Sequence, residues 1–300
     1  MVVTGANSGL GFGTATQAAL HGATVVMTCR SLAKCEEAKR KILADERFAR
    51  RAAEVEKRLV PMEADLNSLK SVKAFAKAYR ASGRPIHSLV LNAGIMAPPH
   101  ELTADGIESQ FGVNHVAHFA LTKDLLDVVV RSQPSTVVAV SSLAHHFAPA
   151  FGFHHDLASL NDPNNYDAHA YYGQSKLANV LFAKELARRL KSEKVYVNAV
   201  HPGGVRGGLT RHIVSRGGSL SWLAERIDRA AQSLLYWDEE TGALTTLAAA
   251  VDPDVAANDV RGKYFVPIGR ISPNSRLGDD EKLARELWDF SEGILKAKGY

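Results

Sequence analysis

The chain has 300 residues, of which 46% are hydrophobic and 23% charged, with a net charge of +4 and an isoelectric point near 9.0. This composition is that of a globular protein with a sizeable core. Basic residues alternate with acidic ones, which disfavours a nucleic-acid partner because such binding needs a clustered basic face. No segment approaches the ~20 continuous apolar residues of a membrane span, and the N-terminus lacks the regions of a signal peptide.

Apolar β-rich runs alternate with helical stretches, which is the pattern of a parallel sheet covered on both faces. The expected strands are residues 2–4, 24–28, 58–63, 86–91, 135–141, 194–200 and 263–266. The helical patterns between them lie at residues 9–21, 32–48, 68–82, 105–131, 171–191 and 241–250. Two irregular segments, 143–169 and 205–237, interrupt the alternation, and each is either a loop over a site or a surface insertion.

The first strand is unusually short. The opening MVVTGA leaves barely three strand residues before a glycine turn, whereas strands usually run about five or six. Either this strand is short or upstream sequence is missing, and a membrane-anchoring segment could be lost with it.

The segment TGANSGLG, residues 4–11, follows this strand and opens a helix. Gly5, Gly9 and Gly11 permit a tight turn and a close backbone approach. The exposed N–H groups at the start of the helix favour a pyrophosphate. The pattern is not the plain GxGxxG fingerprint, because three residues separate its first two glycines, and a simple strand-to-helix turn is the alternative.

The end of the second strand indicates the type of dinucleotide. An NAD-binding unit usually carries an Asp or Glu about 20 residues after the glycine turn, to hold the ribose 2′-hydroxyl. Here the sequence is Thr28-Cys29-Arg30-Ser31. The missing carboxylate and the guanidinium of Arg30 favour NADP(H) over NAD(H), since a guanidinium suits a 2′-phosphate. The alternative is an arginine that is merely exposed.

The only two cysteines, Cys29 and Cys35, lie six residues apart. A secreted protein held by disulfides would normally use more. The cysteine count therefore predicts a reducing, cytoplasmic location, with membrane association left open if the N-terminus is truncated.

Tyr172 and Lys176 stand four residues apart in YYGQSKLANV, residues 171–180, and so share one helical face. A nearby positive charge favours the phenolate over the phenol, whose ordinary pKa is about 10. The pair could therefore act in proton transfer near neutrality. On spacing alone a helix-surface contact is the better explanation, because one such match is expected by chance among many tyrosines and lysines, so other motifs must decide.

Together with the glycine turn, this pair resembles the short-chain dehydrogenase/reductase family, and further family motifs follow in that family's order. They are Asp65-Leu66, Asn92-Ala93-Gly94, Asn114 in VNHVAHF, Ser142 in VVAVSSLAHH, and Pro202-Gly203. The closer likeness is to the branch of retinol dehydrogenases and the WW-domain-containing oxidoreductase, through residues 141–146, 172–190, 201–206, 242–246 and 262–265. The chain departs from this branch at Gly207, where the family commonly has a Ser or Thr that meets the nicotinamide amide.

The resemblance implies an α/β fold: one Rossmann-like, doubly wound parallel domain over residues 1–300, with about seven strands in the order 3-2-1-4-5-6-7. It implies an NADP(H)-dependent oxidoreductase that interconverts a carbonyl and an alcohol on a small lipophilic substrate, such as a retinoid, steroid or lipid aldehyde. Dimers or tetramers are common in the family, so a homodimer is one expectation, and membrane contact is not required. The rival interpretation is a catalytically weak NADP-binding scaffold or redox-sensing interaction protein.

The resemblance also assigns roles. Tyr172 is the general acid/base, Ser142 polarises the carbonyl, Lys176 lowers the phenol pKa and bonds the nicotinamide ribose, and Asn114 holds a water that connects Lys176 to solvent. Alternation along the strand leaves Ser141 and Ser142 open, and the family alignment selects the second. The implied cofactor-binding residues are Gly5, Asn7, Ser8, Gly9, Leu10, Gly11, Arg30, Asp65, Leu66, Asn92, Ala93, Gly94, Tyr172, Lys176, Pro202, Gly203 and Val205. Asn92 has a simple turn as its alternative, and Asp65 a helix cap.

Three further features carry weaker predictions. The pairs His145-His146 and His154-His155 have no cysteine or second metal-type spacing beside them, so no metal site is expected. Tyr171 is expected to pack rather than react. An apolar stripe at helical spacing predicts either a substrate lid within 205–237 or a core-facing helix, with a peripheral membrane contact as a third interpretation; it comprises Leu220, Leu223, Ile227 and Leu234.

Overall fold

A computed structural model describes residues 1–204 and 237–300. The predicted lid of residues 205–237 lies outside the described residues, apart from Trp237, and so does its apolar stripe. The predicted cofactor role of Val205 and the departure from the family at Gly207 also fall there.

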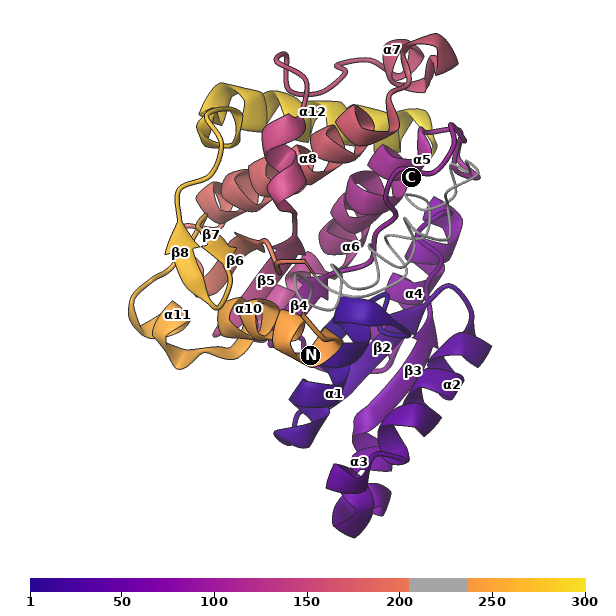
Figure 1. The fold of residues 1–300 in the computed structure, drawn as a ribbon, viewed down its shortest axis with the longest axis vertical. Helices are drawn as coiled ribbons and strands as arrows, with labels where there is room; N and C mark the ends of the chain where they lie inside the picture. The colour runs from indigo at the N-terminus through magenta and orange to yellow at the C-terminus, as the bar shows by residue number, and fades with distance from the viewer. Residues whose placement is uncertain (205–236) are drawn as a thin grey trace, which may run out of the picture.

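The described strands form one eight-stranded sheet in the order β3-β2-β1-β4-β5-β6-β7-β8 (Figure 1). Neighbouring strands from β3 through β7 pair in parallel, and β8 pairs antiparallel with β7. The strands are β1 (Val2–Thr4), β2 (Val25–Cys29), β3 (Leu59–Glu63), β4 (Ser88–Leu91), β5 (Ser135–Val140), β6 (Val195–Val200), β7 (Tyr264–Val266) and β8 (Arg270–Ser272). The predicted order of the first seven is confirmed.

The sequence interpretation missed β8. This strand has three residues, and Arg270 and Ile271 are exposed on it at the edge of the sheet. So short an exposed strand has neither the apolar run nor the alternation that predicts a strand. It closes the edge of the sheet beside β7.

The helices cover both faces of the sheet (Figure 1). They are α1 (Gly9–Leu20), α2 (Leu32–Leu43), α3 (Ala52–Arg58), α4 (Leu69–Ala81), α5 (Ser109–Phe111), α6 (Ala117–Arg131), α7 (Leu157–Asn161), α8 (Ala168–Arg189), α10 (Glu239–Val251), α11 (Pro253–Ala257) and α12 (Glu281–Ala297). Single 3-10 turns lie at Glu46–Arg51, Leu143–Phe147, Pro163–Asn165 and Leu277–Asp279, and a π-helical turn at Gly112–Val116.

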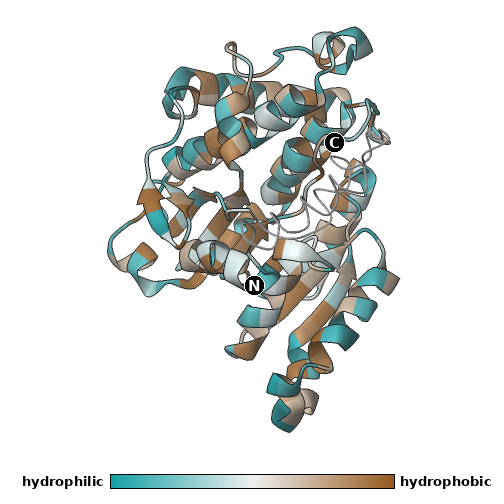
Figure 2. Cartoon of the chain, viewed as in Figure 1, coloured by the Kyte–Doolittle hydropathy of each residue, from teal (hydrophilic) through white to brown (hydrophobic). Residues whose placement is uncertain are grey.

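Two hydrophobic cores lie on opposite sides of the sheet. Because successive strand residues point to opposite faces, Val2 joins the core formed with α4, α6, α8 and α12, whereas Val3 joins the core formed with α1, α2 and α10. Every residue of β5 and β6 is buried. In Figure 2 the hydrophobic colour accordingly concentrates in the central strands, while the outer helices carry hydrophilic stripes. Burial on both faces explains the nearly continuous apolar runs in the sequence.

Several helix predictions need correction. The helix expected over 32–48 ends at Leu43, and the Asp45 side chain accepts a hydrogen bond from the backbone N–H of Arg47 to begin a separate 3-10 turn. The helix expected over 105–131 is interrupted by the π-helical turn. Helices α3 and α12 were not predicted, although α12 buries Leu283, Leu287 and other apolar residues at helical spacing.

Candidate active site

The candidate site lies where β1 and β4 are neighbours and the strand order reverses, which is the crevice where open α/β sheets bind ligands. The turn after β1 carries the glycines, and the turn after β4 carries Asn92, Ala93 and Gly94. Both turns lie at the carboxyl ends of their strands.

The glycine turn approaches its neighbour so closely that side chains are excluded. Gly5 and Gly9 have positive φ angles of 67° and 56°. A Cβ added at Gly11 would lie 2.3 Å from the carbonyl oxygen of Gly5 and 2.4 Å from the Nδ2 atom of Asn92. Glycine is therefore required at position 11 by space, and at position 5 by backbone conformation as well.

Helix α1 begins beside an acid that the sequence interpretation did not select. The N-cap residue, Ser8, makes no side-chain capping hydrogen bond, and the backbone N–H of Gly9 instead donates to Glu239 Oε1 over 2.8 Å. Burial raises the pKa of this half-buried carboxyl, while the bond from Gly9 acts in the opposite direction. Glu239 is 230 residues from Gly9, so only the packing of α10 on α1 reveals the contact.

Tyr172 and Lys176 lie on successive turns of α8, and both are buried, with 8% and 3% of their surface exposed. The carboxylate of Asp167 caps this helix by accepting from the N–H groups of His169 and Ala170. The Lys176 Nζ atom lies 5.6 Å from the centroid of the Tyr172 ring. It also donates to the Val140 carbonyl oxygen over 3.0 Å. The predicted pair thus forms at the end of β5.

Burial sets the protonation of this pair. It raises the pKa of Tyr172 to about 12, while the nearby Ser142 hydroxyl acts in the lowering direction. It also lowers the pKa of Lys176 to about 8. The net shift of the Tyr172 pKa is thus opposite in direction to the lowering expected from Lys176, because removal from water disfavours the phenolate more than its surroundings favour it. At neutral pH Tyr172 is a protonated acid.

The structure distinguishes the two serines at the end of β5. The buried Ser141 hydroxyl donates to the Lys176 carbonyl oxygen over 2.7 Å. Ser142 is only half-buried, accepts from the N–H of Ala144 over 3.2 Å and lies close enough to the Tyr172 phenol to influence its pKa. The structure places Ser142, and not Ser141, beside Tyr172.

Asn114 occupies the middle of the π-helical turn and is fully buried. Its side-chain Nδ2 donates to the Ile95 carbonyl oxygen over 3.0 Å and to Ser175 Oγ over 2.9 Å, and its Oδ1 accepts from Ile95 N over 2.8 Å. A Cβ added at Gly94 would lie 3.1 Å from Asn114 Oδ1 and 3.4 Å from Lys176 Nζ. The structure therefore brings these three predicted residues together, and the main-chain carbonyl oxygen of Asn114, with two lone pairs, can accept a hydrogen bond from a water.

Other predicted cofactor residues have local structural partners. Asn92 Nδ2 donates to the Thr4 carbonyl oxygen over 2.7 Å, and Asp65 Oδ1 accepts from the N–H of Asn67 over 3.0 Å. Helix α4 is capped by Ser68 rather than by Asp65. Leu66 is buried, and Pro202 and Gly203 follow β6, where a Cβ at Gly203 would lie 3.1 Å from the Trp237 ring.

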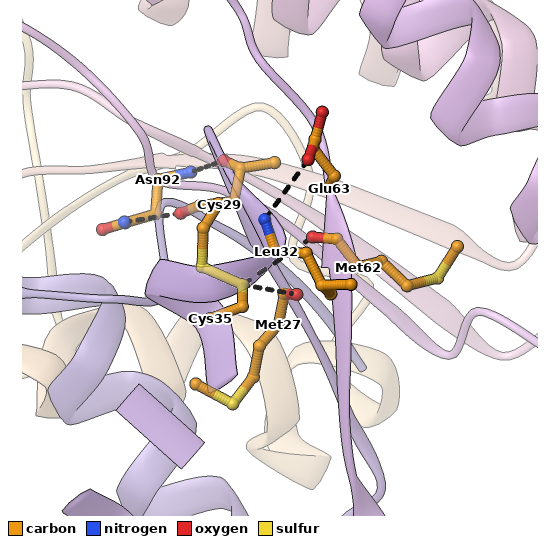
Figure 3. Close-up of a disulfide and its surroundings, with 8 residues drawn as sticks. Met27, Cys29, Leu32, Cys35, Met62, Glu63 and Asn92 are labelled. Atoms are coloured by element: carbon orange, nitrogen blue, oxygen red, sulfur yellow. Dashed lines mark hydrogen bonds between the residues drawn. A yellow bond between two sulfur atoms is a disulfide. The ribbon is translucent and has the colours of Figure 1, made fainter. Parts of the chain in front are cut away.

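The neighbouring ends of β2 and β3 carry charges of opposite sign. Arg30 is exposed, and its guanidinium makes no hydrogen bond or ion pair with any described residue. Beside it, at the end of β3, Glu63 Oε2 accepts from the N–H of Leu32 over 3.3 Å (Figure 3). The sequence interpretation considered only the end of the second strand, so it found no carboxylate here.

The two cysteines on either side of this loop are joined by a disulfide, Cys29–Cys35 (Figure 3). Both are buried, and the Cys35 sulfur lies 3.2 Å from the Met27 carbonyl oxygen. Because a disulfide sulfur has no proton, this is a contact rather than a hydrogen bond. Two cysteines are too few for a disulfide framework, yet they form this local bridge, so the cysteine count does not support the predicted reducing compartment.

His145 and Tyr171, both considered in the sequence analysis, have local structural partners. His145 bonds the Ser142 carbonyl oxygen through Nδ1 over 2.7 Å and the N–H of Ser275 through Nε2 over 3.1 Å. No group of three metal-ligating side chains occurs within residues 1–204 and 237–300. Tyr171 is buried, with its hydroxyl 3.4 Å from the Ser159 carbonyl oxygen, as expected of a packing residue.

The arrangement fits a nicotinamide dinucleotide. The buried Lys176 ammonium has three donors, but Val140 is the one acceptor that the described residues provide. The early N–H groups of α1 have no intrahelical partners, and Ser8 does not cap them with its side chain. Donors for a ribose hydroxyl and for a pyrophosphate are thus present at the crevice.

Comparison with known proteins identifies the family. The model named short chain dehydrogenase matches residues 1–154. Retinol dehydrogenase 14 of Mus musculus is 39% identical over 303 residues, covering 99% of this chain and 86% of that protein. The chain belongs to the short-chain dehydrogenase family. It is accordingly an oxidoreductase of that family.

Two further similarities extend over nearly all of this short-chain dehydrogenase. Human WW domain-containing oxidoreductase is 38% identical over 304 residues, covering 99% of this chain and 68% of that protein. A crystal structure of a Mycobacterium paratuberculosis protein superposes with a TM-score of 0.68 at 34% identity, covering 98% of this chain and 92% of the other. The resemblance stated from the motifs is thereby confirmed. Within the described residues, no helix is both long and apolar enough to cross a membrane.

We expect the disulfide to stabilise this dehydrogenase measurably. Replacing both cysteines, as Cys29→Ala with Cys35→Ala, should lower the free energy of unfolding by about 2 kcal/mol, because the bridge closes a short loop in the unfolded chain. Denaturant unfolding monitored by circular dichroism measures this change. A dithiol reductant should destabilise the native chain similarly and leave the double variant unaffected. Equal stability of the native chain with and without reductant would contradict the expectation.

Proposed function

We propose that this protein is an NADP(H)-dependent oxidoreductase that interconverts a carbonyl and an alcohol on a small lipophilic substrate. The observation that carries the proposal is the buried Tyr172 ring, which lies beside Ser142 and 5.6 Å from the Lys176 Nζ atom at the carboxyl end of β5. A protonated phenol beside a serine hydroxyl suits donation to a carbonyl oxygen. Residues 1–300 would act as a single NADP-binding domain.

The cofactor would lie along the carboxyl ends of the strands. The turn formed by Gly5 and residues 7–11 would bind the pyrophosphate, and Arg30 would bind the 2′-phosphate. Asp65 and Leu66 would border the adenine, and residues 92–94 the adenosine side. Pro202, Gly203 and Val205 would border the nicotinamide. When bound, NADPH supplies the hydride that reduces the carbonyl carbon.

The chain's own residues would move the proton. In reduction, the Tyr172 hydroxyl donates its proton to the carbonyl oxygen as negative charge develops there, and in alcohol oxidation the phenolate accepts it. The Ser142 hydroxyl orients and polarises the same oxygen. The Lys176 ammonium bonds a ribose hydroxyl, and a water on the Asn114 carbonyl oxygen connects the ammonium to solvent.

Exposed apolar side chains that follow Ser142 in the sequence support a lipophilic substrate. Leu143, Phe147 and Phe151 follow the serine within nine residues and are 54%, 70% and 53% exposed. Such residues are usually buried in a folded chain, and a greasy substrate reaching Ser142 would cover them. Relatives named retinol dehydrogenase are consistent with this class of substrate.

We predict that Tyr172→Phe lowers the rate of aldehyde reduction by about 10²- to 10⁴-fold, the usual contribution of a general acid. NADPH affinity, measured by nucleotide fluorescence, should change little. Tyr171→Phe is the matched control, because the neighbouring hydroxyl faces Ser159 and should be dispensable. A native chain that binds NADPH but reduces none of a panel of aldehydes would favour the scaffold interpretation instead.

The cofactor preference is predicted to depend on the charges at the ends of β2 and β3. Arg30→Ala should weaken NADPH binding about 10- to 100-fold, the range for losing a charge-assisted hydrogen bond, and should leave NADH binding unchanged. Glu63→Gln, which removes the neighbouring carboxylate, should instead strengthen NADPH binding relative to NADH. Titration of both nucleotides against each variant measures the preference. An unaltered ratio in Arg30→Ala removes the case for a 2′-phosphate site there.

The pH dependence should reflect Lys176. Its pKa near 8 means that the ammonium is present below that pH and lost above it. The kcat/KM for NADPH reports ionisations of the free enzyme, so it should be flat below about pH 8 and then fall about tenfold per pH unit. Lys176→Arg keeps its charge throughout, and its residual activity should lack the decline. The same decline in this variant would assign it to another group.

A further inference from the structure

A buried histidine connects the cofactor turn to the proton-relay segment. His118 lies in the first turn of α6 and is 2% exposed. Its Nε2 atom lies 2.9 Å from the hydroxyl oxygen of Thr4, the residue that precedes Gly5. Its Nδ1 atom lies 3.0 Å from the main-chain carbonyl oxygen of Asn114. No other side chain within the described residues hydrogen-bonds both the Thr4 hydroxyl and the Asn114 main-chain carbonyl.

The hydrogen-bond partners fix the tautomer of His118. A carbonyl oxygen only accepts, so Nδ1 must carry the proton and donate to Asn114. The Thr4 hydroxyl oxygen already accepts from the N–H groups of Asn92 and Ala93, at 2.8 Å and 3.0 Å. Its own proton is therefore available to Nε2, since the competing Val90 carbonyl oxygen is 3.4 Å away. Burial lowers the pKa of His118 to about 4, so the ring is neutral at physiological pH.

Each of the two hydrogen bonds of His118 positions a different part of the candidate site. At one end, the Thr4 hydroxyl fixes the turn after β4 against the turn that carries Gly5. At the other, the His118 N–H occupies one of the two lone pairs of the Asn114 carbonyl oxygen. The bond thereby directs the second lone pair, on a carbonyl that lies in the π-helical turn beside Lys176.

We propose that His118 is a positioning residue that aligns the cofactor-binding turn, through Thr4, with the carbonyl of Asn114 that holds the relay water. The inference rests on the proposed function. His118 touches neither substrate nor cofactor. Its two nitrogens serve two different steps, cofactor binding and proton supply, and substitutions can separate them.

Two conservative variants test the two ends. In His118→Asn the amide N–H can replace Nδ1 and donate to Asn114, but nothing reaches Thr4. NADPH affinity should therefore fall about 3- to 10-fold, the usual effect of one lost hydrogen bond, with kcat at saturating NADPH unchanged. In His118→Gln the longer side chain can place its amide oxygen at the Nε2 position and accept from Thr4. Here NADPH affinity should be kept and kcat should fall about 3- to 10-fold.

Thr4 provides the matched control. Thr4→Ser keeps the hydroxyl and should keep NADPH affinity. Thr4→Val should weaken NADPH binding at least as much as His118→Asn, because it also removes the acceptor for the N–H groups of Asn92 and Ala93. The losses from Thr4→Val and His118→Asn should not add. The melting temperature of every variant is measured alongside. A purely structural histidine would lower stability in both His118 variants without separating affinity from kcat, and that result would overturn the proposal.

The native chain gives a test that needs no variant to fold. Nitrogen-15 NMR of the imidazoles should find His118 neutral with its proton on Nδ1 at pH 7, and a proton on Nε2 or a charged ring would overturn the proposal. If the native chain binds NADPH but reduces no aldehyde, the proposed function fails, and the tautomer and affinity measurements still test His118. A chain that binds no nicotinamide dinucleotide would overturn both.

Discussion

The close approach of the turn after β1 to the turn after β4 constrains the rest of the site. A Cβ at Gly5 would lie 3.0 Å from Ala93 Cα and one at Gly11 would lie 2.4 Å from Asn92 Nδ2, so the two turns pack with no room for a further side chain between them. The Thr4 hydroxyl oxygen fixes this contact by accepting hydrogen bonds from the N–H groups of Asn92 and Ala93 in the turn after β4. Because Gly94 lies against both Asn114 and Lys176, the same contact sets where the π-helical turn and α8 meet. The position of the buried ammonium therefore depends on glycines 80 and more residues away in sequence.

Desolvation, rather than the attraction between phenol and ammonium, governs the chemistry of this pair. Both Tyr172 and Lys176 are removed from water, and in each case burial is the leading cause of the pKa shift. Both shifts favour the neutral form: a protonated phenol and an amine that gives up its proton more easily. This state suits proton donation during carbonyl reduction. Proton acceptance during alcohol oxidation needs the phenolate, which a bound, positively charged nicotinamide would favour by direct Coulomb attraction.

Sequence patterns predicted the parts of this protein that depend on local chemistry. The runs of β5 and β6 are buried on both faces and were found as strands, and the Tyr172 and Lys176 spacing predicted one helical face. The exposed β8 edge and the break at Gly112–Val116 were not predictable in this way. A three-residue exposed strand has no periodicity, and a five-residue π-helical turn is too short to stand out in a periodicity judged over the whole helical stretch.

The residues missed in the site share one property: their partners are distant in sequence. Glu63 reaches the Leu32 amide only because β3 lies beside β2, and Glu239 reaches Gly9 only because α10 packs on α1. The sign of the Tyr172 pKa shift was also missed, since the spacing gives the nearby charge but not the burial. Motif order identifies the family, therefore, while the electrostatic balance of the site needs the tertiary structure.

At the glycine turn, burial and hydrogen bonding act on the pKa of Glu239 in opposite directions. The N-terminus of α1 carries a partial positive charge and unpaired N–H groups, and the fold places a carboxylate of its own there. This contact agrees with the anion preference predicted from the turn. The pKa of Glu239 is nevertheless raised. Burial therefore destabilises the ionised carboxylate more than the hydrogen bond from the Gly9 N–H stabilises it. One poorly compensated carboxylate is a weak ligand for this helix end, and an anion with more charge and more acceptor oxygens would bind the same N–H groups more strongly.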